Sequence, residues 1–394
     1  MKKQPIQQQI LDSLAQVSVH KWEEGVTNFR QEVGIYQKDS SIIGLNLRHS
    51  NLSAFPKAIL DLSDLQYLDI SGNQIPEIPS GIGQLKKLQL FYADNNAIED
   101  LPKTISHLSE LVALHLDNNK LKDVPLQIGS LDKLRTLSLH KNKLLRLPDT
   151  LWDLKMLKKL VIGSNPLGEL PERIAQLQHL TELYIHDIHA KRLPEGICQL
   201  VHLNTLDAAH NQLKVLPHEM GNLRQLSRFL YLSNNQLKTL PDSLSQLQLL
   251  TYLNLTDNQF IALPEWIGDL KALRECRLYN NQLDTLPDSI GKLSHLSALY
   301  LQNNRINRLP KTLAQLQQLQ VLELRNNQLQ QLPSQLAALQ NLTHLDLRAN
   351  YLTQIPSWVE QLPQLQLLDL RWNKLSRIPD WVSDGEKTGI KLYY

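Results

Sequence analysis

The chain has 394 residues, of which 41 are lysine or arginine and 39 are aspartate or glutamate, so its formal charge is +2. A hydrophobic content of 42% is enough to build a long core and excludes a chain that is disordered throughout. The near-neutral charge argues against a general nucleic-acid binder and against a polybasic membrane binder, because both need an excess of basic residues.

The cysteine content and the apolar stretches indicate a compartment. Cys198 and Cys276 are the two cysteines, and a secreted chain of this length would be expected to carry more of them, as disulfides. Polar residues such as Asp12 and Gln16 interrupt the amino-terminal stretch where a secretory signal would be apolar. No run approaches the ~20 apolar residues of a membrane-spanning helix. We therefore expect a soluble, cytoplasmic protein.

The first 40 residues predict a helical cap. Ile6, Ile10, Leu14 and Val17 recur at helical spacing and would form one apolar face. Such a face would cover the open end of a core that begins after it. We expect residues 1–40 to be this amino-terminal cap.

A repeat occupies residues 41–379. A Leu-Pro dipeptide, or a close variant, returns every 23 residues from Pro56 to Pro379, except for one interval of 24 between Pro217 and Pro241, which gives fifteen units. In each unit a Leu-x-Leu pair has the period-two spacing of a strand with one buried face. The proline then opens a short return segment, because it lacks an N–H donor and fixes φ. A single unit cannot bury its leucines alone, so neighbouring units must stack into a continuous core.

The pattern resembles the leucine-rich repeat family, in its 23-residue intracellular class with Leu-Pro after the strand. That class includes bacterial repeat proteins and Ras-associated scaffolds of animals and plants. The resemblance covers about nine-tenths of the chain and implies an α/β solenoid, a horseshoe of about fifteen repeats. It would have a parallel sheet on its concave side and short helices or turns on its convex side. The fold implies no particular function, because one architecture serves many partners.

An asparagine column follows the strands. One amide per unit recurs at the point where the chain leaves the predicted strand, where it can bond backbone groups of its own and neighbouring units. We interpret the column as structural. Its members are Asn73, Asn96, Asn119, Asn142, Asn165, Asn211, Asn235, Asn258, Asn281, Asn304, Asn327, Asn350 and Asn373.

The sequence shows no convincing catalytic or metal-binding constellation. Cys198 and Cys276 lie three units apart, too far for a disulfide within one solenoid, and neither has a recognisable nucleophile motif around it. His186, His189 and His210 suggest a zinc site, but the alternation of side chains along strands would not bring them to one point. We therefore predict a non-enzymatic protein with no metal and no cofactor. A metal-dependent hydrolase at these histidines is a minor alternative.

Function is expected on the side chains that face out of the sheet. These lie six, four and two residues before each column asparagine, with one more at the rim. Seven of the eleven tyrosines fall at these positions, which are Tyr67, Tyr92, Tyr184, Tyr231, Tyr252, Tyr279 and Tyr300. Strand propensity explains part of the excess. Aromatic and arginine side chains are also the types that become anchors at interfaces.

The same positions carry seven basic and eleven acidic residues, so the concave face is acidic relative to the whole chain. Such a face would attract a protein with a basic patch and would repel nucleic acid. In the last units Arg325, Arg348 and Arg371 form one column beside carboxylates and end at Trp372. Two interpretations stay open: an exposed ladder of salt bridges, or arginines held for a partner's carboxylates.

Two further segments depart from the regular pattern. One extra residue lies between Leu226 and Leu230, before a strand, where it predicts a bulge or a change of curvature. After the last repeat proline, residues 380–394 are expected to be a short closing segment.

We therefore predict a scaffold that binds a protein partner on its concave face. The predicted contact residues are Tyr184, Phe229, Tyr231, Tyr252, Tyr279, Tyr300, Arg277, Arg325, Arg348, Arg371 and Trp372. Two alternatives use the same chemistry. In the first alternative the chain is a bacterial effector that binds a host protein in the host cytosol. In the second it is the recognition half of a larger multidomain enzyme. The partner's identity and the oligomeric state do not follow from the sequence.

Overall fold

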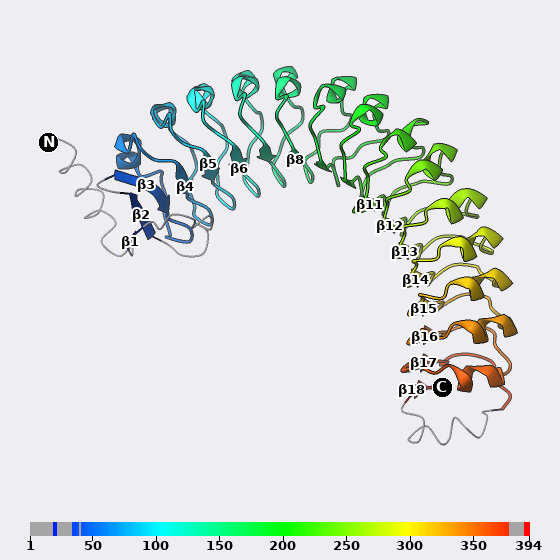
Figure 1. Cartoon of the computed structure of the whole chain (residues 1–394). Coiled ribbons are helices and arrows are strands. Elements are labelled where there is room, and N and C mark those ends of the chain that lie inside the picture. Colours follow the sequence, from blue (N-terminus) through cyan, green and yellow to red (C-terminus); the bar gives the residue numbers. More distant parts are fainter. Residues whose placement is uncertain (1–18, 22–33, 39–40, 378–389) are drawn as a thin grey trace. The chain divides into compact units, whose positions relative to one another are not determined.

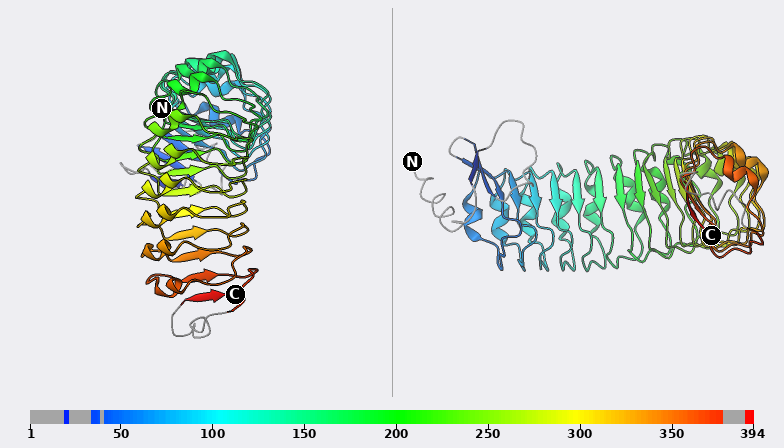
Figure 2. Two further views of the ribbon diagram at one scale, coloured as in Figure 1. Left: turned by 90° about the vertical axis from the view of Figure 1, so that its right-hand side faces the viewer. Right: turned by 90° about the horizontal axis from the view of Figure 1, so that it is seen from below.

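The protein is seen here in a computed structural model that describes residues 19–21, 34–38, 41–377 and 390–394 (Figure 1). The chain divides into two compact units, Met1–His189 and Ala190–Tyr394. In each unit short strands form one face, and short 3-10 helices form the opposite face (Figures 1 and 2). The strand side of each unit is its concave side, which confirms the arrangement expected of stacked repeats (Figure 1).

In unit 1 strands alternate with 3-10 helices from β3 onward. The strands are β1 (Val19–Lys21), β2 (Gly34–Lys38), β3 (Ser41–Asn46), β4 (Tyr67–Asp69), β5 (Leu90–Tyr92), β6 (Ala113–His115), β7 (Thr136–Ser138), β8 (Lys159–Val161) and β9 (Glu182–Tyr184). The helices are η1 (Lys57–Asp61), η2 (Ser80–Gln84), η3 (Lys103–His107), η4 (Leu126–Ser130), η5 (Asp149–Asp153) and η6 (Glu172–Gln176). Each strand pairs with the next, and every pairing is parallel except that of β2 with β3.

Unit 2 repeats the same order, with parallel pairing throughout. Its strands are β10 (Thr205–Asp207), β11 (Phe229–Tyr231), β12 (Tyr252–Asn254), β13 (Glu275–Arg277), β14 (Ala298–Tyr300), β15 (Val321–Glu323), β16 (His344–Asp346), β17 (Leu367–Asp369) and β18 (Lys391–Tyr393). Its helices are η7 (Glu195–Gln199), η8 (Met220–Asn222), η9 (Asp242–Gln246), η10 (Glu265–Asp269), η11 (Asp288–Lys292), η12 (Lys311–Gln315), η13 (Ser334–Ala338) and η14 (Ser357–Gln361).

The leucine pattern explains the two faces of each strand. In the repeat built on β12, Leu253 and Leu255 are buried in the core, and Tyr252, which precedes Leu253 in the strand, points to the other side. Pro264 then precedes η10, and its carbonyl accepts the N–H of Ile267 at 3.1 Å, which closes the 3-10 turn. Ile267 points back into the core and is fully buried. Proline suits this position because its fixed φ matches the extended backbone before the turn, and because the turn needs its carbonyl and not an N–H.

The asparagine column is structural, as predicted. Asn281 lies within 3.0 Å of the carbonyl oxygens of Leu255 and Leu278 through Nδ2, and its Oδ1 accepts the N–H of Phe260 at 3.1 Å. The Asn281 side chain thus joins its own repeat to the preceding repeat. Buried backbone groups need hydrogen-bond partners, and these bonds supply them at the point where the chain leaves the strand.

The residue before each column asparagine adopts a left-handed backbone conformation. Examples are Asn280, Asn303 and Asn326, with φ between 55° and 57°. Their side chains form a second ladder, in which Nδ2 of Asn303 donates to Asn280 at 2.5 Å and Nδ2 of Asn326 donates to Asn303 at 2.9 Å. Asparagine tolerates this conformation better than most residues, which accounts for the Asn-Asn pairs in the sequence.

The two ends differ in part from the expectations. The predicted helical stripe from Ile6 to Val17 lies outside the described residues. The described parts of the predicted cap are strands, not helix: β1 pairs with β2, and β2 pairs antiparallel with β3. At the other end, residues 380–389 of the predicted closing segment also lie outside the described residues, and β18 adds a last parallel strand to β17.

The inserted residue causes no slip in the sheet. Phe229 of β11 is in register with Thr205 and with Tyr252, and Leu230 remains fully buried. The extra residue is accommodated in the loop before β11, because moving it into the strand would turn Leu230 away from the core. The expected bulge is therefore absent from the pairing of β10, β11 and β12. No helix in the described part of the chain has the length and apolarity needed to cross a membrane.

Candidate functional site

Two neighbouring strands of unit 2 bring aromatic side chains together on the concave face. In β11, Phe229 and Tyr231 flank the buried Leu230, so both rings point away from the core. In β12, Tyr252 takes the same direction beside Leu253. The strand spacing of about 4.8 Å then places these rings within contact distance of one another.

The rings form one connected cluster. The centroids of Phe229 and Tyr231 lie 5.6 Å apart in a stacked arrangement, and Tyr252 lies 5.5 Å from Phe229 and 5.0 Å from Tyr231. Further along the sheet, the guanidinium of Arg277 lies 5.6 Å from the ring of Tyr252 and 5.1 Å from the ring of Tyr300. We call Phe229, Tyr231, Tyr252, Arg277 and Tyr300 the aromatic–arginine cluster.

Glu275 holds the central arginine of this cluster. It lies two residues before Arg277 on the same face of β13, and Nε of Arg277 donates to its Oε1 at 2.6 Å. The guanidinium is therefore fixed between two rings by a charge-assisted hydrogen bond. Glu275 was counted among the acidic positions in the sequence but was not predicted as a site residue. A carboxylate two residues before an arginine in one strand is the signal that would have found it.

The cluster is accessible but well supported. Phe229 is 39% exposed, and the other four members are half-buried. Burial raises the pKa of the Tyr252 phenol above its usual range, so the hydroxyl remains a hydrogen-bond donor at all physiological pH values. Rings held by their neighbours lose little conformational freedom when a partner packs on them.

Two predicted tyrosines stand apart from the cluster. Tyr279 lies two residues beyond the end of β13 and is half-buried. Tyr184 belongs to unit 1, where its hydroxyl donates to Glu182 at 3.2 Å and Lys159 lies 5.1 Å from its ring. Lys159 and Glu182 form an ion pair at 3.1 Å. Tyr184 is thus part of a local polar group on strands β8 and β9.

Two of the three arginines in the column are held by buried carboxylates. Arg371 bonds Asp369 through two nitrogens, with Nε–Oδ1 at 3.0 Å and Nη2–Oδ2 at 2.6 Å. Arg348 donates from Nε to both oxygens of Asp346 at 2.9 Å and lies 3.3 Å from Asp369. Asp346 and Asp369 are buried, so the interpretation as an exposed salt-bridge ladder is wrong for the acidic half of the column. Breaking such a pair costs more than breaking a surface pair, because a buried charge would be left alone.

Arg325 behaves differently from its two neighbours in the column. No ion pair or hydrogen bond joins its guanidinium to another residue in the described part of the chain, although Glu323 stands two residues before it. Glu323 instead accepts a hydrogen bond from Nε2 of Gln302 at 3.2 Å. Burial and the adjacent Asp346 carboxylate raise the pKa of Glu323 to about 7.

Trp372 ends the column on the rim. It is 71% exposed, its φ is 61°, and Arg371 lies 5.7 Å from its ring. The same guanidinium lies 4.9 Å from the ring of Tyr393 in β18. Tryptophan is unusual at this left-handed position. In most other repeats asparagine, aspartate or a small residue occupies it.

The two cysteines are core residues. Cys198 and Cys276 are both buried. Burial raises the pKa of the Cys276 thiol to about 12, so it carries no thiolate near neutral pH.

The histidines that first suggested zinc are not the metal-ligand group that the structure assembles. His189 lies 3.9 Å from Asp187, and both are exposed. Among the described residues, one group brings together possible metal ligands: Asp94, His115 and Asp117, whose ligand atoms all lie within 4.8 Å of one another. This group was not predicted from the sequence, because its residues come from two successive repeats and not from one motif.

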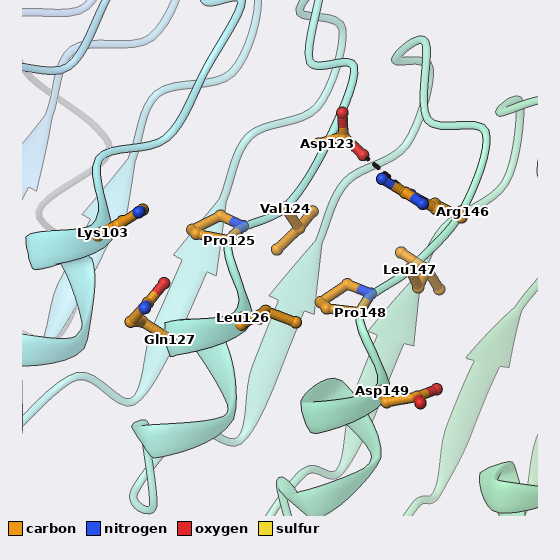
Figure 3. A pocket seen from close by; sticks show the side chains of 10 residues that line it. All are labelled: Lys103, Asp123, Val124, Pro125, Leu126, Gln127, Arg146, Leu147, Pro148 and Asp149. Atoms are coloured by element: carbon orange, nitrogen blue, oxygen red, sulfur yellow. Dashed lines mark hydrogen bonds and ion pairs between the residues drawn. The ribbon is translucent and has the colours of Figure 1, made fainter.

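Unit 1 also has a pocket on the segments that lead from strand to helix (Figure 3). Val124, Pro125 and Leu126 line it on one repeat, and Leu147 and Pro148 line it on the next. Asp123 and Arg146 form an ion pair at 3.4 Å across its edge, and both are exposed. The pocket lies away from the concave face, and its polar groups do not converge on one point (Figure 3).

Comparison with known protein families identifies the repeats. A model described as leucine-rich repeat region matches residues 44–119. Models described as leucine-rich repeat match residues 109–167 and 317–375, and residues 228–247 and 249–270. The search of curated proteins finds no match.

Solved structures of several repeat proteins are similar to this chain. A leucine-rich repeat protein of Leptospira interrogans is 30% identical, covers 95% of this chain and 100% of its own, and has a TM-score of 0.71. An internalin of Listeria monocytogenes is 26% identical, with coverage of 76% and 85% and a TM-score of 0.67. The plant peptide hormone receptor RGFR1, solved in complex with RGF2, is 25% identical, with coverage of 87% and 60% and a TM-score of 0.67.

Proposed function

Because the chain belongs to the leucine-rich repeat family, we propose that it is a non-enzymatic scaffold that binds a protein partner on the concave face of unit 2. The aromatic–arginine cluster is the centre of the contact, and the arginine pairs of Arg348 and Arg371 form a second contact area on the same face. The observation that carries the proposal is the cluster itself, in which ring contacts join Phe229, Tyr231 and Tyr252, and the guanidinium of Arg277 links Tyr252 to Tyr300 on the same face.

The composition of the cluster supports binding to protein. Tyrosine and arginine dominate interface hot spots, because they combine a large apolar surface with a polar end. Phe229 offers the most exposed apolar surface of the five, and Arg277 is already oriented by Glu275. A partner that covers this area would bury about 800 Å² on each side if the interface is of ordinary size.

The charge of the same face supports a partner with a basic patch. The concave positions of unit 2 carry four arginines and six carboxylates, a difference of −2. The acidic members are Asp207, Asp257, Glu275, Glu323, Asp346 and Asp369. A net acidic surface steers cationic partners toward it and lowers its affinity for nucleic acid.

The similarity to RGFR1 is consistent with this proposal, because that receptor was solved in complex with RGF2. The same fold therefore supports recognition of a polypeptide ligand in a relative of 25% identity. The identity of the ligand does not transfer, since concave side chains are not dictated by the core.

The experiment is affinity capture followed by measurement of affinity for the captured protein. A double variant, Phe229→Ala with Tyr252→Ala, removes two rings of the cluster, and Tyr351→Ala removes a tyrosine that is 44% exposed elsewhere in unit 2. We expect the double variant to weaken binding of the partner at least tenfold, and the control to bind as the native chain does. Equal binding by the double variant would place the contact elsewhere.

A further inference from the structure

Two adjacent repeats of unit 1 bring three possible metal-ligand side chains close together on the concave face. Asp94 follows β5 by two residues, His115 is the last residue of β6, and Asp117 follows β6 by two residues. Tyr92 of β5 is in register with His115, so the parallel pairing sets the separation of these side chains. One ligand atom of each residue lies within 4.8 Å of the others. We propose that Asp94, His115 and Asp117 bind one divalent transition-metal ion.

The carboxylates are oriented by the sheet. Oδ1 of Asp94 accepts the N–H of Asp117 at 2.9 Å. Oδ1 of Asp117 accepts the N–H of His140 at 2.8 Å and the hydroxyl of Ser138 at 2.6 Å. A hydrogen bond to one oxygen fixes the plane of a carboxylate, which is how supporting residues orient metal ligands in known sites.

The imidazole is also held in place. The ring of Tyr92 lies 4.7 Å from the ring of His115 on the neighbouring strand. Asp94 is buried, and His115 and Asp117 are half-buried, so an ion would sit at the base of the face with solvent or a ligand on its open side. A site on strands with fixed rotamers loses little free energy to ordering when the ion binds.

The donor set selects the class of ion. Two carboxylates and one imidazole suit zinc, manganese, iron, cobalt or nickel better than calcium or magnesium, which favour oxygen ligands alone. The positive ion would also offset the repulsion between the carboxylates. Asp117 forms no ion pair with a lysine or arginine in the described part of the chain. The carboxylates of Asp346 and Asp369 in unit 2 differ in this respect, because guanidinium groups already neutralise them.

The test uses the full chain, purified and dialysed against a chelator, with Zn²⁺ as the probe. Isothermal titration of the native chain is expected to show one site that His115→Ala weakens at least tenfold. Asp117→Asn keeps the hydrogen-bond acceptor and should weaken the same site. Circular dichroism and thermal unfolding in chelator confirm that each variant is folded, and Zn²⁺ should raise the Tm of the native chain but not that of His115→Ala.

His344→Ala is the matched control, because His344 is a half-buried histidine on strand β16 of unit 2 and lies outside the group. It should bind Zn²⁺ as the native chain does. Zinc binding that persists unchanged in folded His115→Ala and Asp117→Asn would come from histidines elsewhere and would overturn the proposal. The absence of any binding in the native chain would overturn it as well. None of these outcomes depends on the partner-binding proposal for unit 2.

Discussion

The side-chain carbonyl of Asn281 accepts the backbone N–H of Phe260, a residue of the preceding repeat, at 3.1 Å. The amide nitrogen of Asn281 meets two buried carbonyl oxygens at 3.0 Å, one of which also belongs to the preceding repeat. One side chain therefore satisfies three backbone groups that the stack has removed from water. The same arrangement recurs along both units, for example at Asn119 and Asn350.

Replacement of Asn281 by alanine should lower the free energy of unfolding by about 2 kcal/mol or more, because unsatisfied buried polar groups keep their full desolvation cost. Chemical denaturation of unit 2, with hydrogen exchange at Phe260 as a local probe, measures the loss. Asn307→Ala is the control, since Asn307 is exposed and outside the column. A loss below about 0.5 kcal/mol for Asn281→Ala would mean that water replaces the amide in the stack.

A second prediction concerns the close approach of two helices in unit 2. A Cβ atom built on Gly268 in η10 would lie 2.2 Å from the carbonyl oxygen of Ser289 in η11. Gly268→Ala should therefore force η10 and η11 apart and destabilise unit 2 by about 2 kcal/mol, the usual scale of overpacking.

The control for this prediction is Ala338→Gly in η13, where Ala338 is exposed, so that removing its methyl group changes stability mainly through backbone freedom. Thermal unfolding monitored by circular dichroism compares the two variants. An unchanged Tm for Gly268→Ala would show that the helices can separate at little cost, which would contradict tight helix stacking as the reason for glycine there.

The regular part of the fold could be predicted from the sequence because one physical constraint repeats. A period of 23 residues with leucines at fixed places determines which residues are buried, and therefore which columns face out of the sheet. Tyr231, Tyr252 and Tyr300 were placed on the concave face by counting from the column asparagine, and the structure puts them there. Their role in binding stays a prediction.

Contacts within a column could not be predicted, because they depend on side-chain conformations and neighbours. Arg325, Arg348 and Arg371 occupy equivalent positions, yet two of them pair with aspartates while Glu323 turns to Gln302. A glutamate is one methylene longer than an aspartate, so Glu323 reaches Gln302 of the preceding repeat. The strands β1 and β2 were missed for another reason: they lie outside the repeat, where helical spacing of four residues was the one pattern available.

A third prediction follows from the backbone of Trp372. Its φ of 61° is unfavourable for a residue with a bulky side chain, and its ring is mostly exposed. Trp372→Asn should raise the free energy of unfolding by ~1 kcal/mol, because asparagine tolerates the left-handed conformation. Ala349→Asn, at the equivalent position with φ of 50°, should give a gain of similar sign. Thermal unfolding measures both.

The two variants separate strain from ring contacts. If Trp372→Asn destabilises the chain while Ala349→Asn stabilises it, the contact of the indole ring with Arg371 outweighs the strain. If both variants destabilise the chain, an asparagine at this end of unit 2 gains no stability from the side-chain ladder that Asn280, Asn303 and Asn326 form. A gain in stability together with a loss of partner affinity would be the signature of strain kept for binding.

The last prediction is a pH dependence at Glu323. Burial and Asp346 raise its pKa to about 7, and Arg348 and Gln302 from the neighbouring repeats oppose that rise. In the unfolded chain the pKa of this group is about 4.3. Between these two values the folded chain binds the extra proton, so stability must fall as the pH rises through this window. Above pH 7 both states are ionised, and the full penalty of the half-buried charge remains.

Glu323→Gln removes this charge and should leave stability at about pH 4 nearly unchanged, while raising it at about pH 8 by up to about 1 kcal/mol after solvent screening of a partly exposed group. Urea denaturation at the two pH values measures the difference. Glu360→Gln is the control, because Glu360 is exposed in η14, away from the strands that carry this group. A gain of equal size at both pH values would show that the introduced amide improves packing and that the proton on Glu323 has no part in the effect.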